Sequence, residues 1–424
     1  MRTLRISINQ RSFEKNGQPF FYLADTCWSA FTNITDTDWL YYLKHRKLQG
    51  FNVLQINILP QWDASVFEGR IMPYSLNEQG GFDYSKINLA YFEHAQSMVE
   101  IATTMGFEVA LVILWCNYVP STWASQMSDV NIMPKEYIRE YVQLVDQYFS
   151  KFDPMYVISG DTDFNEVSTE YYEIAMDEIC RLSPKTLKTT HIKGRYLQIP
   201  NSLVNKMDFY MYQSGHNAEP QNANMPYFQA EHFYKNYPVK PLINSEPCYE
   251  QMGFSRGLFG KWSQDDVRKA AYQSVLSGAF AGITYGAAGV YQWHTPDSYF
   301  DELMGEGFAR CEDWMKALHY PGAWDYGWLK EHMESMSFET MVPEYHLVSN
   351  EQIRVSSVND KEMILIYSPV PTQIKLNERF DGYSVKAYDL KNRQVMQLPY
   401  STSKDQTHID ASTCAKDVLV VMSR

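Results

Sequence analysis

The sequence has no excess of positive charge, no long apolar segment and no closely spaced cysteines. Its 424 residues carry a formal net charge of −13, which disfavours a nucleic-acid surface and favours neutral partners. No segment approaches the roughly 20 apolar residues that cross a bilayer. The six cysteines are scattered singly, without the spacing of metal ligands or of a disulfide framework. We therefore expect a globular protein with neither nucleic-acid nor membrane partners.

The segment at Met1–Ser7 and the cysteines also bear on location. Met1–Ser7 is followed at once by the polar stretch Asn9–Arg11, so it lacks the apolar region of a secretory signal. Three cysteines follow predicted strands, where unpaired thiols suit a reducing compartment: Cys27, Cys116 and Cys248. The sequence therefore predicts a cytoplasmic protein.

Aromatic residues are abundant, at 15% of the chain with 31 Tyr and 10 Trp. One interpretation is a large core with some aromatic surface. The other is a sugar-binding cleft, because the flat C–H faces of sugars stack on aromatic rings. Composition alone leaves both open.

Eight short apolar runs alternate with amphipathic segments over the first three-quarters of the chain. This pattern predicts parallel strands buried on both faces and joined by helices. We predict an α/β fold, a (β/α)8 TIM barrel, over residues 1–328. A doubly wound open sheet shares the local pattern, but no Gly-x-Gly-x-x-Gly follows the first run. The runs are Phe20–Asp25, Val53–Leu59, Val109–Trp115, Met155–Ser159, Leu187–His191, Phe209–Gln213, Pro241–Ser245 and Ile283–Gly286.

After about Trp328 helical periodicity fades and short alternating runs appear, such as Ile353–Val358 and Val418–Met422. Turn signals separate these runs, which is typical of antiparallel strands. We predict a small antiparallel β-sandwich over residues 329–424. The join at Pro321–Trp328 is aromatic and is not a flexible linker, so we expect the two domains to pack closely.

Two carboxylates follow predicted strands of the barrel. Asp161 follows the fourth run and Glu246 the seventh, so both face the mouth of the barrel, where active sites of this fold lie. Such a pair suits a retaining glycosidase, with Glu246 as nucleophile and Asp161 as general acid and base. Asp163 is the rival acid, although its position in a turn favours a structural role.

Other residues at strand ends are candidates for binding substrate. Each is individually more often structural, but a polar group after nearly every strand is typical of a barrel active site. The polar candidates are Asp25, Asn57, Asn117, His191, Gln213 and His216, and the aromatic candidates are Trp28, Trp115, Tyr285 and Trp293.

Two other functional classes fit parts of the pattern. A barrel metal hydrolase needs paired ligands such as His-x-His after the first strand, where this chain has Asp25-Thr26-Cys27. His191, His216 and Glu246 could still ligate a metal, but we predict no metal and no cofactor. The second class is a carbohydrate-binding barrel without activity, in which the carboxylates only accept hydrogen bonds from hydroxyl groups.

The strand-end motifs resemble those of the apiosidase-like glycoside hydrolases. The resemblance covers most of the chain and is carried by Phe21–Trp28, Gly50–Gln55, Gly160-Asp161, Thr190-His191, Gln213–His216, Asn244–Glu250 and Tyr285-Gly286. It implies a barrel followed by a β-sandwich.

The resemblance also assigns roles to the two carboxylates. It implies that Asp161 is the acid of a Gly-Gly-Asp motif and Glu246 the nucleophile of an Asn-x-Glu motif. Ser159 replaces the first glycine of Gly-Gly-Asp. The expected reaction is hydrolysis of O-glycosidic bonds in plant-type or related glycans, as in an apiosidase or arabinofuranosidase.

Overall fold

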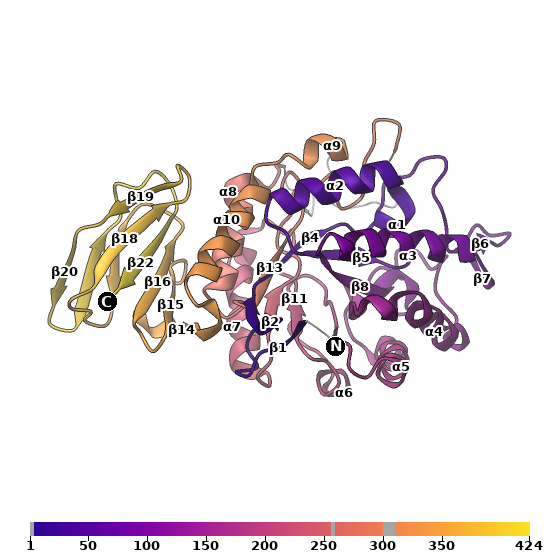
Figure 1. Cartoon of the computed structure of the whole chain (residues 1–424), viewed down its shortest axis with the longest axis horizontal. Coiled ribbons are helices and arrows are strands. Elements are labelled where there is room, and N and C mark those ends of the chain that lie inside the picture. Colours follow the sequence, from indigo (N-terminus) through magenta and orange to yellow (C-terminus); the bar gives the residue numbers. More distant parts are fainter. Residues whose placement is uncertain (1–3, 256–258, 300–309) are drawn as a thin grey trace.

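The computed structural model describes residues 4–255, 259–299 and 310–424. An eight-stranded parallel sheet curls into a barrel, and an antiparallel β domain follows it along the long axis of the molecule (Figure 1). This architecture confirms the predicted barrel and its C-terminal companion. The barrel strands are β4 (Tyr22–Thr26), β5 (Val53–Asn57), β8 (Glu108–Trp115), β9 (Met155–Gly160), β10 (Lys188–Thr189), β11 (Tyr210–Tyr212), β12 (Leu242–Asn244) and β13 (Gly282–Tyr285).

The strands are hydrogen-bonded in the order β10-β9-β8-β5-β4-β13-β12-β11, which follows the chain around the barrel. The two end strands meet through an isolated parallel bridge between His191 and Met211. Asp208 N–H also donates to the carbonyl oxygen of Lys188, at 2.7 Å. The barrel is therefore closed, with its seam between β10 and β11.

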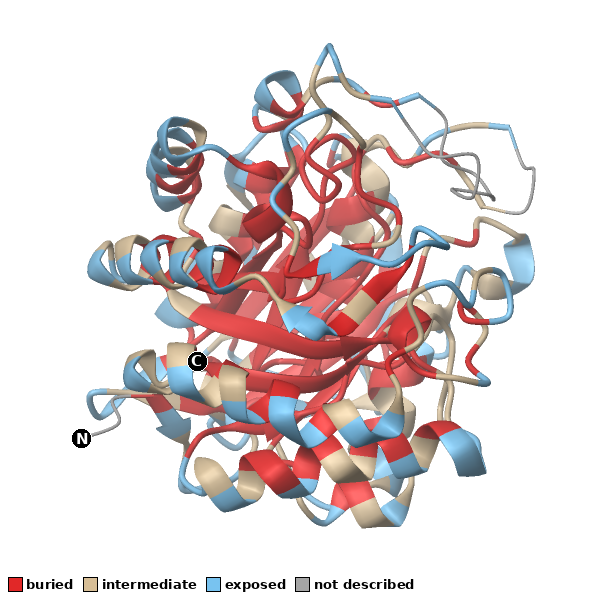
Figure 2. Ribbon diagram, turned by 90° about the vertical axis from the view of Figure 1, so that its right-hand side faces the viewer, coloured by how far each residue is buried: buried red, intermediate tan, exposed pale blue. Residues whose placement is uncertain are grey.

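Helices surround the barrel, and their outward faces are exposed while the strands are buried (Figure 2). In β8 every residue except Glu108 is buried, as expected for a parallel strand covered on both faces. Within the described ranges, no helix combines the length and apolarity that a membrane span needs. The helices are α1 (Ala30–Asn33), α2 (Asp36–Leu48), α3 (Leu89–Thr104), α4 (Ile138–Phe149), α5 (Glu166–Leu182), α6 (Asn201–Val204), α7 (Met225–Asn236), α8 (Gln264–Val275), α9 (Trp314–Ala317) and α10 (Gly322–Ser335).

Helix starts follow local capping rules. Thr35 caps α2 by accepting a hydrogen bond from Asp38 N–H. Ser263 and Asp266 form a reciprocal capping box at the start of α8. Short 3-10 turns fill several connections: η1 (Cys116–Tyr118), η2 (Lys135–Tyr137), η3 (Ser150–Phe152), η4 (Pro220–Asn222), η6 (Phe338–Thr340) and η7 (Tyr345–Leu347).

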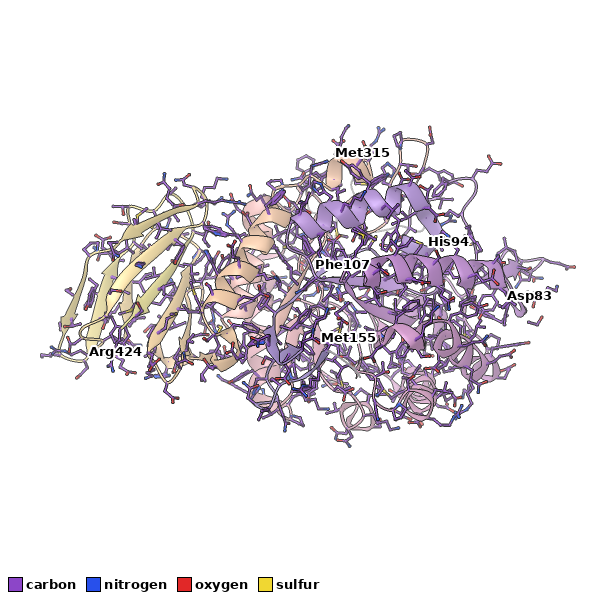
Figure 3. The ribbon with its side chains drawn as sticks, in the orientation of Figure 1. Asp83, His94, Phe107, Met155, Met315 and Arg424 are labelled. Carbon is purple, nitrogen blue, oxygen red and sulfur yellow. The ribbon has the colours of Figure 1, made fainter. Side chains whose placement is uncertain are left out.

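Two small sheets flank the barrel, and of their residues only Phe20 falls within a predicted strand. One is an N-terminal antiparallel sheet of β1 (Leu4–Ile6), β2 (Phe13–Lys15) and β3 (Gln18–Phe20). The other is a hairpin of β6 (Tyr74–Leu76) and β7 (Phe82–Ile87), within the long connection after β5. Asp83, in this hairpin, and Arg424, in the C-terminal domain, lie at opposite ends of the molecule (Figure 3).

The C-terminal domain contains two antiparallel sheets, ordered β14-β15-β16-β22-β18-β19 and β17-β21-β20. It has its own buried apolar cluster, which includes Ile366, Ile374 and Val420. The predicted boundary at Trp328 falls inside α10. The strands are β14 (Val342–Pro343), β15 (Arg354–Val358), β16 (Met363–Ser368), β17 (Gln373–Leu376), β18 (Ser384–Asp389), β19 (Gln394–Gln397), β20 (Tyr400–Ser403), β21 (Gln406–Asp410) and β22 (Val418–Ser423).

A buried ion cluster joins the two domains where α8 and α10 lie between the barrel strands and the sandwich (Figure 1). Arg268, on α8, binds both oxygens of Asp417 from the sandwich, at 2.8 and 2.6 Å. Its other terminal nitrogen donates to Asp325 on α10, at 2.9 Å. All three side chains are buried, so the sandwich is packed against the barrel by charge pairing as well as by apolar contact.

Candidate active site

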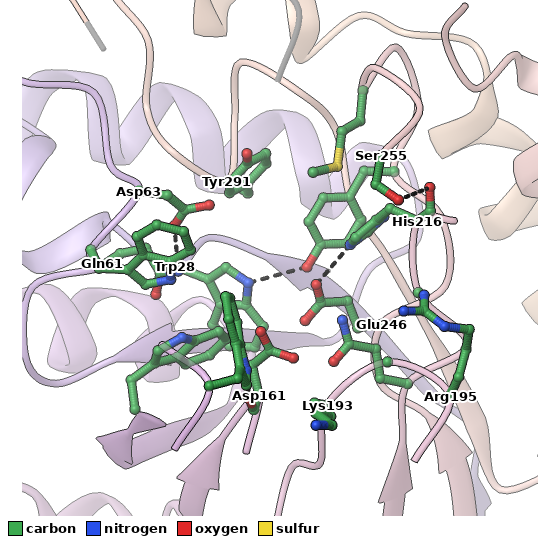
Figure 4. A pocket seen from close by; sticks show the side chains of 18 of the residues that line it. Trp28, Gln61, Asp63, Asp161, Lys193, Arg195, His216, Glu246, Ser255 and Tyr291 are labelled. Carbon is green, nitrogen blue, oxygen red and sulfur yellow. Dashed lines mark hydrogen bonds and ion pairs between the residues drawn. The ribbon is translucent and has the colours of Figure 1, made fainter. Parts of the chain in front are cut away.

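A cavity of about 430 Å³ opens where the carboxyl ends of the barrel strands converge. Residues at or beyond the carboxyl ends of all eight barrel strands line it, among them Asp63, Asp161 and Glu246. Figure 4 shows Asp161 and Glu246 pointing into the same space from separate strand ends. The size is typical of a small-molecule site.

Glu246 lies two residues beyond β12 in a turn fixed by Asn244. The Asn244 side-chain oxygen accepts a hydrogen bond from Glu246 N–H at 3.4 Å, and its amide group donates to Ser214 and Ser274. Glu246 is 6% exposed. The turn therefore holds a nearly buried acid at the cavity wall.

Two histidines face the Glu246 carboxylate. His216 Nε2 donates to Oε1 at 2.8 Å, and His191 Nε2 lies 3.2 Å from Oε2. The Nδ1 atom of His191 accepts from Asp161 N–H at 2.9 Å, so the ring proton of neutral His191 is on Nε2, toward Glu246. Burial raises the pKa of Glu246, but the two imidazoles outweigh it and hold this pKa at about 2. Glu246 is thus an anion at neutral pH.

Asp161 directly follows β9 and has a left-handed backbone, with φ 45°, a conformation that Asp adopts more readily than most residues. Its carbonyl oxygen accepts from Trp123 Nε1 at 2.7 Å. Burial raises the pKa of Asp161 well above its usual range, and the charges of Glu246 and Asp63 raise it further. Asp161 therefore retains its proton in conditions where Glu246 has lost its own.

Gly160 makes room for the cavity floor. A Cβ atom at this position would lie 2.0 Å from a ring carbon of Trp115, which no side chain tolerates. The glycine before Asp161 is therefore required by the close approach of the Trp115 ring to β9.

Asp163 is occupied by other partners. Its Oδ1 accepts from Trp123 N–H at 3.2 Å, and its Oδ2 binds Lys193 Nζ at 2.8 Å. Asp163 is not among the residues that line the cavity. Its contacts fix the loop that carries Asp161.

Five of the ten predicted substrate-binding residues lie at the cavity. Trp28, Trp115, Gln213 and His216 line it. His191 is fully buried behind the wall and reaches Glu246. These residues combine aromatic rings with hydrogen-bonding groups, as a sugar site requires.

The structure places the other five elsewhere. Asp25 is fully buried, bound by Arg46 Nε at 2.7 Å and Tyr42 OH at 2.6 Å, because it turns toward α2 and away from the mouth. Tyr285 donates to Glu250 at 2.6 Å.

The remaining three also have structural surroundings. Trp293 stacks on Trp314, with ring centroids 4.2 Å apart. Asn57 donates to the side chain of Gln61, and Asn117 is buried in η1. Asp25, Asn57, Asn117, Tyr285 and Trp293 do not line the cavity.

Several cavity residues had no signal in the strand pattern, because they lie on loops. Asp63 is a third acid, 5% exposed, and it accepts a hydrogen bond from Gln61 Nε2. Burial raises the pKa of Asp63 to about 7, and the charge of Glu246 adds to this effect. Trp62 and Trp123 also line the cavity. The run Gln61-Trp62-Asp63 after the second strand was the available clue.

Comparisons with known proteins agree with this architecture. A family model described as "Apiosidase-like, catalytic domain" matches residues 7–340. A solved structure titled "Glycoside hydrolase" superposes with a TM-score of 0.80 at 21% identity, covering 99% of this chain and 96% of the other. A glycoside hydrolase family 5 structure from Bacteroides vulgatus ATCC 8482 gives 0.80 at 22% identity, covering 99% and 93%. No curated protein matches the chain. With its family match, its barrel and its paired carboxyl groups, this chain belongs to the apiosidase-like family and is a glycoside hydrolase.

Proposed function

We propose that this glycosidase acts with retention of anomeric configuration, with Glu246 as nucleophile and Asp161 as acid and base. The observation that supports the proposal is the opposite environment of the two carboxyl groups on one cavity. The pKa of Glu246 is about 2 and that of Asp161 is raised well above its usual range. Such a separation assigns the charged group to attack and the neutral group to proton donation.

The proposed reaction has two steps. Glu246 attacks the anomeric carbon while Asp161 gives its proton to the departing glycosidic oxygen, which forms a glycosyl ester and releases the leaving group. Asp161, now ionised, takes a proton from water, and the resulting attack at the same carbon releases the sugar and restores Glu246.

His191 contacts both Asp161 and Glu246. One imidazole nitrogen accepts the backbone N–H of Asp161 and the other faces the Glu246 carboxylate. A single ring thus links the backbone of Asp161 to the carboxylate of Glu246, the kind of support that a catalytic geometry needs. His216 holds the second Glu246 oxygen.

We infer that the substrate is a plant-type or related glycan carrying an apiosyl, arabinofuranosyl or similar unit. The proposal follows the family, and the aromatic lining of the cavity supports it, because sugar faces stack on aromatic rings.

All six cysteines are free thiols, which supports a reducing, cytoplasmic location.

The test is a panel of 4-nitrophenyl glycosides that includes apiosides and arabinofuranosides. We expect turnover of at least one, with NMR showing that the first-formed sugar has the configuration of the substrate. Glu246→Gln, nearly isosteric but without the attacking charge, should fold normally and lose nearly all turnover. An inverted first product, or a variant with more than a few per cent of the wild-type rate, would contradict the mechanism. Saturable binding without hydrolysis would indicate a silent carbohydrate-binding barrel.

The acid is tested separately by comparing Asp161→Ala with Asp163→Ala. Asp161→Ala should lose little with a good leaving group and far more with a poor one, and azide should partly restore its turnover. If Asp163→Ala shows this behaviour and Asp161→Ala does not, Asp163 is the acid.

A further inference from the structure

Two half-buried tryptophans lie on the cavity wall and are not among the groups assigned to the two reaction steps. Trp62 and Trp123 both line the cavity and meet edge to face, with ring centroids 5.7 Å apart at 81°. Both keep part of their surface exposed, whereas Trp28 and Trp115 are 2% and 3% exposed. Met127, 47% exposed, lines the same cavity. An aromatic wall left partly open to solvent, in a cavity that also holds carboxyl groups, is a surface suited to a ring-shaped ligand.

Trp62 and Trp123 are held by fixed loops. Trp62 lies between Gln61 and Asp63, which are buried and hydrogen-bonded to each other. The Trp123 loop is fixed by Thr122, which donates to the carbonyl oxygen of Cys116 at 2.6 Å. Trp62 and Trp123 together form an aromatic platform. Because their loops are fixed, this platform loses little side-chain freedom when a ligand binds.

Contacts to Asp161 indicate which part of the substrate the platform meets. The Trp123 indole N–H donates to the Asp161 carbonyl oxygen at 2.7 Å, and Trp123 N–H donates to Asp163 at 3.2 Å. In a retaining displacement the nucleophile and the acid flank the scissile bond, and the acid touches the departing oxygen. The wall attached to the Asp161 loop therefore faces the leaving group, and the opposite wall at Glu246 faces the sugar that is transferred.

We propose that Trp62 and Trp123 form a leaving-group subsite that selects substrates in which the departing alcohol is a ring, such as a cyclic sugar of a glycan chain. The inference rests on the proposed function, because the side of the leaving group follows from the roles of Asp161 and Glu246. Trp62 stacks on the ring of the leaving group. Trp123, whose plane lies at 81° to that of Trp62, borders the same ring at its edge. It is also a positioning residue for Asp161, through its indole N–H.

Leaving-group dependence tests the subsite. The substrates are the fluoride, the methyl glycoside and the 4-nitrophenyl glycoside of the sugar that the panel identifies, of which only the last has a ring as leaving group. Trp62→Ala should lose roughly tenfold or more in kcat/KM for the 4-nitrophenyl glycoside, mainly through KM, and little for the fluoride and the methyl glycoside. Equal losses on all three substrates would overturn the subsite. Trp324→Ala, on the exposed face of α10 and outside the cavity, is the matched control.

Trp123→Phe separates the aromatic contact from positioning. It keeps an aromatic ring at the cavity wall but removes the N–H bond to the Asp161 carbonyl oxygen. We expect kcat to fall for the methyl glycoside, whose poor leaving group needs the acid, and to change little for the fluoride. A variant whose rates match wild type on both substrates would refute the positioning role.

A binding measurement keeps the inference testable without turnover. The Glu246→Gln protein is labelled with 5-fluorotryptophan, and the ¹⁹F signals of Trp62 and Trp123 are assigned with the corresponding Phe variants. Adding panel 4-nitrophenyl glycosides should shift both signals, and the glycosyl fluoride should not; the signal of Trp324 should stay in place. If the ¹⁹F signals shift but the wild type hydrolyses no substrate, the proposed function is contradicted and the platform is supported. If the wild type hydrolyses the substrate but the signals do not shift, only the platform is contradicted.

Discussion

Replacing Arg268 by Met should destabilise the whole protein while leaving the cavity intact. The guanidinium group is 1% exposed and bonds to Asp417 and Asp325. Without it, Asp417 keeps a contact with Tyr367 OH at 3.3 Å, and Asp325 keeps Arg393 at 3.0 Å. Breaking a buried pair by removing one partner costs about 3–5 kcal/mol. Because Arg393 still compensates one carboxylate, we expect a loss near the lower end of this range, at about 3 kcal/mol.

Urea unfolding followed by tryptophan fluorescence measures this loss. Arg268→Met should lower the denaturation midpoint while kcat and KM stay close to wild type. Adding Asp417→Asn should recover part of the loss, because the stranded charge is removed as well, giving a non-additive cycle. Arg379→Met, which removes an exposed pair with Asp381, is the control and should change little. A loss below about 1 kcal/mol, or strict additivity in the cycle, would refute the view that buried charge holds the domains together.

Three further changes test the site and its surroundings. Gly160→Ala should lower kcat/KM about a hundredfold on a 4-nitrophenyl glycoside, because the new Cβ would lie 2.0 Å from the Trp115 ring next to Asp161; an unchanged rate would contradict this. Burial raises the pKa of Glu250 from 4.5 to about 7, so its contribution to stability is fully present below pH 4.5 and is lost as pH rises through 7. Between these pH values the free energy of unfolding of wild type, measured by urea titration, should therefore fall by roughly 3 kcal/mol more than that of Glu250→Gln. An identical change of this free energy with pH in both proteins would argue against it. Asp63→Asn removes a charge that raises the pKa of Asp161, so the alkaline limb of kcat/KM should move to lower pH; a fixed limb would show that the two acids do not interact.

The barrel was predictable because its strands are short apolar runs that alternate with amphipathic segments. β8, eight residues long with one partly exposed residue, leaves little ambiguity about a strand buried on both faces. The N-terminal sheet was missed because its strands, such as β1 and β2, have three residues each. Three residues cannot display a repeat, and only their mutual pairing makes them strands.

The carboxylates could be found because strand ends fix where a residue lies around the mouth. The direction of a side chain is not encoded in that position. Asp25 also follows the pattern, yet Arg46, 21 residues later, draws it into the core. Asp63 and Trp123 contribute to the cavity from irregular loops, where no periodic signal exists. Such residues are brought to the site by tertiary packing, which a single sequence does not display.

The position of the barrel seam has a consequence for the working life of the enzyme. β10 has two residues and β11 three, and the bridge between them includes His191, whose ring also holds Glu246 and the Asp161 backbone. A brief opening of the seam between β10 and β11 would misalign both carboxyl groups while the other strands stay paired. Amide protons along the seam should exchange with deuterium sooner than those of β8, and heat should abolish turnover below the melting temperature. Shelf life is then governed by a local opening rate, and not by the global free energy of unfolding.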